Sequence, residues 1–340
     1  MSRLGILFLV STLEAANYTA TWLNARGENE VVLSDASRRQ EVRIAVGMGH
    51  NAYSYTVNGK QVFWSPYATM AEWKAKPTLL GNPFLGPWAN RIDGLSYTVE
   101  GKKYVLNPEL RNLRLDNHQQ PIHGLLAYSD LWRVVNVKAD EKSAWVTSRI
   151  EFWRYPALMA QFPFAHNLEM TYRLRDGALE VETSLENLSA SAMPVAVGFH
   201  PYFKISDAPR DAWRVHLAAK DHVLLTSTLV PSGQTEPVKT MDTKLEGVVL
   251  DDVFTNLVRD GEGRAAFTVQ GASEKISVIY GPKYPVAVVY APKGRDFICF
   301  EPMAGVTNVF NLAARGAFPL QMVAAGGTWK ESYWIRPEGF

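Results

Sequence analysis

The chain has 340 residues, 47% of them hydrophobic and 20% charged, with 24 glycines and 19 prolines. This composition is that of a globular protein and excludes a disordered or collagen-like chain. The 35 basic and 34 acidic residues leave a formal charge of +1. Because nucleic-acid-binding proteins usually carry a basic excess, no nucleic acid is expected as a partner.

The N-terminal residues have the pattern of a short secretory signal peptide. Arg3 precedes an apolar run over residues 4–13, and small residues follow at 15–16. The run is too short to span a bilayer, and no other segment approaches that length, so no membrane partner is expected. We expect a periplasmic or secreted protein if residues 1–16 are a signal peptide, and a cytoplasmic one if they are the first element of the fold. Residues 17–340 are then expected to form one domain.

Strand patterns follow one another along the chain. Alternating apolar and polar residues, typical of strands with one buried face, predict strands at 53–57, 95–99, 104–106, 132–137, 145–152, 168–174, 179–185, 195–199, 213–217, 276–280 and 286–290. Asn58-Gly59, Glu100-Gly101 and Asp176-Gly177 each separate two such runs, and these residue pairs favour tight hairpin turns.

The order of these elements indicates the fold class. No regular alternation of strands and helices occurs, and no amphipathic helix longer than two turns is evident. We also find no internal repeat and no low-complexity linker. The sequence therefore predicts an all-β protein built as one large antiparallel β-sandwich.

Two loop segments contain candidate binding residues. Asn90 and Arg91 stand between a Pro/Gly-rich approach at 81–86 and the Asp93-Gly94 turn. Arg91 offers a planar fork of donors that suits sugar hydroxyls or a carboxylate, or a structural ion pair. His123 precedes a glycine, and is either a substrate ligand or a turn residue.

Two further segments contain candidate acid–base residues. His200 follows the strand at 195–199 and precedes a proline. A histidine at a strand terminus can serve as a general acid. The alternative is a core histidine bonded to the backbone. Glu301 is expected to close the apolar strand 297–300, where burial would raise its pKa toward that of a usable base. A structural ion pair is the alternative for Glu301.

Other kinds of site are not indicated. The seven histidines show no metal-ligand spacing, and nucleotide-binding loops and a serine nucleophile elbow are absent from the sequence. The single cysteine, Cys299, excludes an intrachain disulfide and a cysteine-rich metal site. Because Cys299 lies in an apolar run, we expect a buried, inert thiol. No metal is expected.

Taken together, these segments resemble the motifs of the aldose 1-epimerase (galactose mutarotase) family. The similar pieces are Ala-Asn-Arg-Ile at 89–92, His-Gly at 123–124, His-x-Tyr-Phe at 200–203 and Glu-Pro at 301–302. Leu250-Asp-Asp-Val-Phe254 resembles the family's Asp-x-x-Phe segment, with Asp251 as a sugar-hydroxyl ligand. The resemblance extends from about residue 17 to the C-terminus.

The resemblance implies a β-supersandwich that interconverts the α and β anomers of a free hexose without a cofactor. Glu301 would act as general base on the C1 hydroxyl and His200 as general acid on the ring oxygen. Asn90, Arg91, His123 and Asp251 would bind the substrate, a monosaccharide. The protein would be a monomer or a homodimer.

Two departures from the family pattern bear on the substrate. Hexose-6-phosphate epimerases have a segment similar to His-Gly-Phe-Ala-Arg, whose arginine helps to hold the phosphate. Ala127 stands at the position of that arginine, so a phosphosugar is disfavoured. Gly86-Pro-Trp replaces the commoner Gly-Arg-aliphatic approach, which leaves the preferred sugar open. The alternatives are a hexose-6-phosphate 1-epimerase and a non-catalytic carbohydrate-binding domain on the same fold.

Overall fold

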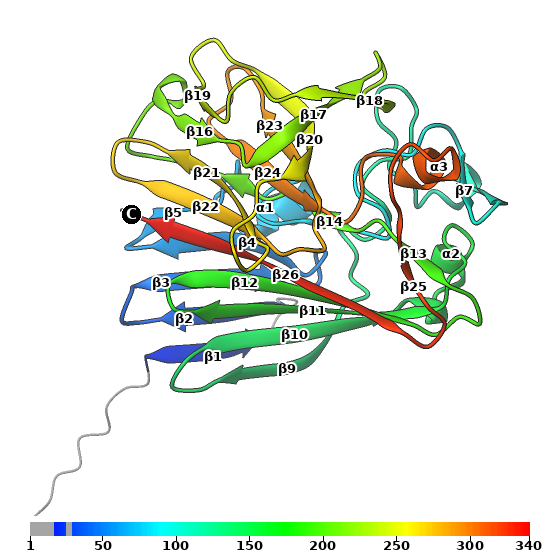
Figure 1. Ribbon diagram of the computed structural model, residues 1–340. Coiled ribbons are helices and arrows are strands. Elements are labelled where there is room, and N and C mark those ends of the chain that lie inside the picture. Colours follow the sequence, from blue (N-terminus) through cyan, green and yellow to red (C-terminus); the bar gives the residue numbers. More distant parts are fainter. Residues whose placement is uncertain (1–16, 25–28) are drawn as a thin grey trace, which may run out of the picture.

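The computed structural model describes residues 17–24 and 29–340 of the chain (Figure 1). The signal peptide expected at residues 1–16 lies outside the described residues. In the part of the chain that is described, no helix is long and apolar enough to cross a membrane.

Three large antiparallel sheets make up most of the molecule. The first has five strands, β1 (Tyr18–Leu23), β2 (Glu30–Asp35), β3 (Gln40–Ala45), β4 (Asn51–Val57) and β5 (Lys60–Gln61). The second has nine, in the order β19 (Asp242–Lys244), β16 (Arg214–His216), β21 (Ala265–Gln270), β22 (Lys275–Tyr280), β26 (Thr328–Glu338), β12 (Ala178–Asn187), β11 (His166–Arg175), β10 (Ala144–Glu151) and β9 (Arg133–Ala139). In Figure 1, β26 runs between β22 and β12.

The third sheet has eight strands and holds most of the candidate site. Its order is β18 (Pro231–Pro237), β17 (Ala219–Leu225), β20 (Leu250–Leu257), β23 (Val286–Ala291), β24 (Ile298–Met303), β14 (Gly198–Phe199) and β6 (Phe84–Leu85), with β15 (Tyr202–Phe203) also paired to β24. Two small sheets pair β7 (Ser96–Val99) with β8 (Lys102–Val105) and β13 (Met193–Val195) with β25 (Gln321–Val323).

Helices are few and short in the described chain. They are α1 (Met70–Ala75), α2 (Pro156–Met159) and α3 (Val309–Ala314), with 3-10 turns at Pro108–Leu110, Phe152–Arg154 and Arg210–Ala212. The all-β sandwich predicted from the strand patterns is therefore confirmed. One cluster of buried apolar side chains, with members from Tyr18 to Ile335, draws on all three large sheets.

The three predicted hairpins are present. Val57 pairs with Lys60 across the Asn58-Gly59 turn, and Arg175 pairs with Ala178 across Asp176-Gly177. The Glu100-Gly101 turn joins β7 to β8. In each turn both central residues have positive φ, which asparagine, aspartate and glycine adopt more readily than other residues. Local residue choice is therefore sufficient to fix these turns.

The strand predicted at 195–199 is divided in the structure. Residues up to Val195 belong to β13, and β14 begins at Gly198. Between them, Ala196 forms a parallel bridge with Trp88 and accepts a hydrogen bond from the Ala89 N–H at 2.6 Å. The chain therefore changes partners at Ala196, because the loop 86–92 takes the hydrogen bonds that a continuous strand would have used.

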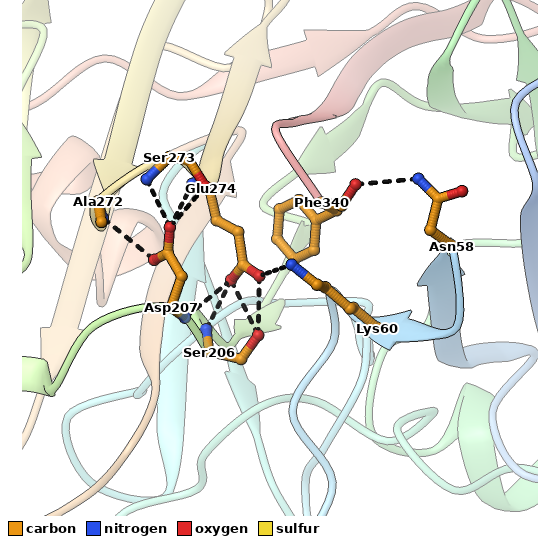
Figure 2. Close-up of polar contacts among 8 residues, drawn as sticks. All are labelled: Asn58, Lys60, Ser206, Asp207, Ala272, Ser273, Glu274 and Phe340. Carbon is orange, nitrogen blue, oxygen red and sulfur yellow. Dashed lines mark hydrogen bonds and ion pairs between the residues drawn. The ribbon is translucent and has the colours of Figure 1, made fainter.

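The segment after β15 is fastened to the turn between β21 and β22 (Figure 2). The Asp207 carboxylate accepts the backbone N–H groups of residues 272–274. In return, the Glu274 carboxylate accepts from the backbone and hydroxyl of Ser206 and from Lys60 Nζ on β5. These contacts tie residues 206–207, which follow β15, to the nine-stranded sheet directly and to the five-stranded sheet through Glu274 and Lys60.

Candidate active site

A row of side chains crosses four neighbouring strands of the eight-stranded sheet. Asp251 on β20 is paired with Tyr290 on β23, Tyr290 with Cys299 on β24, and Cys299 with Tyr202 on β15. Directly paired residues project from the same face of a sheet. Four segments that are far apart in the sequence therefore present their side chains along one line.

The predicted acid–base pair lies on this face. Glu301 is two residues after Cys299 on β24, so the alternation of the strand places it beside the row. His200 Nε2 lies 3.2 Å from Glu301 Oε1. The His200 ring stacks on Tyr202, with centroids 4.6 Å apart and planes 6° from parallel. The structure thus brings together two residues that are 101 positions apart.

Glu301 lies within β24, with two more strand residues after it, and does not close the strand as the sequence analysis expected. It is buried, with only 1% of its surface exposed. The proline that follows it is paired with Ala287 and does not end the ladder. A carboxyl group in the middle of a buried strand is more costly to ionise than one at a strand end.

A second part of the site is built from two loops in close contact. The loop 86–92 and the segment 121–125 are joined by a bridge between Gly86 and Gly124 and by the Leu125 N–H, which donates to the Gly86 carbonyl at 2.7 Å. Gly124 has φ +64°, and a Cβ atom there would lie 2.2 Å from that carbonyl oxygen. Only glycine combines this conformation with this approach, which explains the His-Gly pair.

The predicted binding residues are positioned by these loops. The His123 N–H donates to the Asn90 carbonyl at 2.8 Å, and the His123 ring lies edge-on to His200 with centroids 5.4 Å apart. Arg91 Nη1 donates to Asn90 Oδ1 at 3.0 Å, and Arg91 Nε donates to Asp116 Oδ2 at 2.7 Å. Asp116 therefore orients Arg91. Nothing in the sequence singled out Asp116, because it lies in an ordinary polar turn.

Three buried polar atoms of the site have no partner among the residues that the structure describes. They are His123 Nδ1, His200 Nδ1 and Glu301 Oε2. Buried polar atoms in folded proteins are nearly always hydrogen-bonded. Unpaired groups concentrated at one place are therefore available to a polar ligand that supplies both donors and acceptors, as a sugar does.

Burial shifts the proton affinities of the pair in opposite directions. It raises the pKa of Glu301 well above its usual value; nearby Asp251 adds to this and Arg91 opposes it. Burial lowers the pKa of His200 to about 3, with a further decrease from Arg114 and Arg91. Burial thus favours the uncharged forms of both groups, and a pair that can exchange one proton between its members suits simultaneous donation and acceptance.

Asp251 completes the set of predicted residues. Its pKa is raised, chiefly by burial, and its charge acts on both Glu301 and Tyr290. All six predicted residues thus lie in one region. Tyr202 and Tyr290 also face this region, although the sequence analysis had not selected them. Across the described ranges, no group of three or more His, Cys, Asp or Glu side chains has the arrangement of a metal site.

Comparison with solved structures identifies the fold as that of galactose mutarotase-like proteins. A galactose mutarotase-like protein from Clostridium acetobutylicum superposes with a TM-score of 0.80 at 18% identity, covering 95% of this chain and 98% of that one. A galactose 1-epimerase from Lactobacillus acidophilus NCFM superposes with a TM-score of 0.74 at 14% identity, covering 96% and 100%. At these identities the likeness establishes the fold alone.

The sequence model of aldose 1-epimerase matches residues 46–336, so this chain belongs to the aldose 1-epimerase family. Among curated proteins, the uncharacterized protein YihR of Escherichia coli K12 is 29% identical over 135 residues, which are 39% of either chain. The uncharacterized protein YphB of the same organism is 27% identical over 126 residues, 37% of this chain and 38% of YphB. The chain therefore matches well under half the length of these relatives.

The buried Cys299 fits the expectation of an inert thiol, because burial raises its pKa well above the usual value.

Proposed function

We propose that this protein is an aldose 1-epimerase that interconverts the α and β anomers of a free hexose. The observation that carries the proposal is the contact of 3.2 Å between His200 Nε2 and Glu301 Oε1, together with the unpaired Glu301 Oε2 and His200 Nδ1. The two groups are close enough to exchange a proton and face a cluster of polar side chains. Such a pair can remove a proton from one oxygen of a sugar while it delivers a proton to another.

The reaction proceeds by ring opening and closure. Glu301 accepts the proton of the C1 hydroxyl while His200 donates a proton to the ring oxygen, and the bond between C1 and the ring oxygen breaks. The open-chain aldehyde rotates about the C1–C2 bond. Ring closure on the other face of the carbonyl reverses both proton transfers. No electron is gained or lost, so the reaction needs no redox partner and no cofactor is proposed.

The remaining residues orient the sugar. Arg91 is held by Asp116 and Asn90, so its guanidinium occupies a fixed position, and it also lowers the pKa of Glu301, whose carboxylate form is the base. His123 packs edge-on against His200, and Asp251 is paired with Tyr290 in the row beside Glu301; both are proposed to bind hydroxyl groups. Correct orientation of a bound substrate contributes to the rate without proton transfer.

Polarimetry tests this proposal. Optical rotation of freshly dissolved α-D-glucose and α-D-galactose is followed with the wild type, Glu301→Gln and His200→Asn. Loss of one acid–base group is expected to slow the catalysed reaction roughly 10²- to 10⁴-fold. If the wild type gives only the spontaneous rate on every aldose tested, the protein is not a mutarotase. Sugar binding seen by calorimetry without acceleration would instead support a non-catalytic carbohydrate-binding domain.

A further inference from the structure

Arg114 is a cationic residue beside the candidate site that the acid–base reaction does not use. Its backbone carbonyl accepts the Ile122 N–H at 2.9 Å, and Leu115 forms a bridge with Pro121, so this segment runs alongside the one that ends in His123. The Arg114 guanidinium lies beside the hydroxyl of Tyr128. Tyr128 in turn packs against the small apolar cluster that contains Tyr202.

The charge of Arg114 is not neutralised within the protein. The other arginine of the site, Arg91, forms an ion pair with Asp116 at 2.7 Å and a second contact with Asn90. Over residues 17–24 and 29–340, by contrast, no carboxylate lies within 4.0 Å of Arg114, and its side chain is exposed to solvent. Arg114 is therefore available to bind an anion from solution.

Arg114 lies on the histidine side of the site. Its positive charge acts on His123, His200 and Tyr202 and lowers the pKa of each, although burial has the largest effect on all three. The charges that act on the pKa of Glu301 are instead those of Asp251 and Arg91. The strand register agrees with this: Asp251 and Tyr202 stand at the two ends of the row that runs through Tyr290 and Cys299, and Arg114 lies beside Tyr128, which packs against the cluster containing Tyr202.

The position of the ring oxygen then determines which part of the sugar faces Arg114. In the proposed reaction His200 donates to the ring oxygen, which is bonded to C1 and C5. C5 carries the exocyclic carbon C6. A substituent on C6 therefore extends to the histidine side of the site and away from Glu301, which acts at the C1 hydroxyl.

We propose that the substrate is an aldose with an anionic group on C6, and that Arg114 binds this group with the Tyr128 hydroxyl as a second polar contact. This rests on the proposed epimerase function and replaces the free hexose named there with an aldose charged at C6. A guanidinium fork can bind a carboxylate or a phosphate through two parallel hydrogen bonds. Ala127 offers no charge to a phosphate, whereas Arg114 supplies a cation from another segment.

The test compares neutral and anionic aldoses that share one ring. Glucose, glucuronate and glucose 6-phosphate are assayed by magnetisation exchange between the two anomeric protons in NMR spectra, with the spontaneous exchange subtracted. The measured quantity is kcat/KM for each anionic sugar divided by that for glucose. Arg114→Gln removes the charge. Arg111→Gln is the matched control, because Arg111 is an exposed arginine three residues away that is not among the charges acting on His123, His200 or Tyr202.

The wild type is expected to favour at least one anionic sugar. Arg114→Gln is expected to reduce that preference roughly 10- to 100-fold, the loss of one charge-assisted contact, whereas Arg111→Gln retains the preference. The better of glucuronate and glucose 6-phosphate identifies the anion as a carboxylate or a phosphate. A wild type that favours glucose, or a preference that Arg114→Gln leaves intact, overturns the substrate class while the epimerase proposal stands. Absence of acceleration on all three sugars overturns both.

Discussion

Replacement of Glu274 by glutamine should destabilise the fold without altering the chemistry of the site. Glu274 is fully buried. Its carboxylate accepts the Ser206 N–H at 2.6 Å, the Ser206 hydroxyl at 2.9 Å and Lys60 Nζ at 2.9 Å (Figure 2). Each of these groups is a donor. Glutamine keeps one acceptor oxygen but turns an NH2 group toward the donors on the other side.

The expected cost follows from these contacts. Loss of one charge-assisted hydrogen bond to a buried carboxylate costs about 1.5–3 kcal/mol, and a donor left facing a donor adds to this. The ion pair contributes less, about 0–1 kcal/mol, because 47% of the Lys60 side chain is exposed and solvent screens it. We expect Glu274→Gln to lower the free energy of unfolding by about 2–4 kcal/mol, and Tm by roughly 3–6 °C.

Urea unfolding followed by tryptophan fluorescence, together with thermal unfolding, measures this cost. Lys60→Met removes only the ion pair and should cost about 1 kcal/mol or less. Glu262→Gln is the surface control, because Glu262 is exposed and pairs with the exposed Arg264. The reasoning is refuted if Glu274→Gln costs under about 0.5 kcal/mol, or if Lys60→Met costs as much as Glu274→Gln.

The same residue makes stability depend on pH. Burial alone would raise the pKa of Glu274, but hydrogen bonds from Lys60 and Ser206 outweigh it and lower the pKa below the ordinary 4.5. A carboxyl with a depressed pKa contributes stability above its unfolded value and loses it as the pH falls through the folded value. The difference between wild type and Glu274→Gln is therefore expected to shrink below about pH 4.5 and to be constant above it.

Three further predictions concern the site and the core. Burial raises the pKa of Glu301 well above its ordinary 4.5 and lowers that of His200 to about 3. We therefore expect kcat to fall only on the alkaline side, as the pair loses its proton, and an activity rise centred near pH 4.5 would contradict this. Gly124→Ala should raise KM and lower the free energy of unfolding by about 1–2 kcal/mol or more, because its Cβ would meet the Gly86 carbonyl. Gly101→Ala is the control, since Gly101 also has positive φ but open space around it; it should lose only the free energy of the unfavourable φ and leave KM unchanged. Burial lowers the pKa of His166 to about 4, so between pH 6.5 and 4 the unfolded chain binds a proton there and the folded chain does not. The free energy of unfolding should therefore fall by up to about 3 kcal/mol as the pH is lowered across that window. His166→Asn, which keeps a donor to the Phe164 carbonyl, should flatten the dependence of Tm on pH.

The parts of this fold that were predictable from the sequence are those set by neighbouring residues. The Asp176-Gly177 hairpin depends on two turn residues and on the alternation of the strands beside them, and both are visible in the sequence. The division of the strand at Ala196 was not predictable, because it depends on the loop 86–92, more than a hundred positions away. Local alternation indicates that a segment is extended, but it does not identify the partner of each residue.

The site shows the same distinction more sharply. The sequence singled out Glu301 because a carboxyl group in an apolar run is unusual, yet its relation to His200 depends on the pairing of β15 with β24 and of β14 with β24. A shift of that register by one residue would turn Glu301 to the opposite face of the sheet. Tyr290 enters the site through the same register, since it is paired with both Asp251 and Cys299, and its sequence surroundings are those of any core strand.

Arg114 and Asp116 illustrate why charged residues near the site escaped detection. Both lie in a polar segment whose composition is that of a solvated loop, and their different roles follow only from contacts. Asp116 lies 2.7 Å from Arg91 and neutralises it, so the guanidinium of Arg91 is fixed and its charge is largely compensated. Arg114, two residues earlier, has no such carboxylate within the described chain. The uncompensated charge beside the site therefore comes from the less buried of the two arginines, and the substrate charge that we propose depends on a residue outside the motifs that define the family.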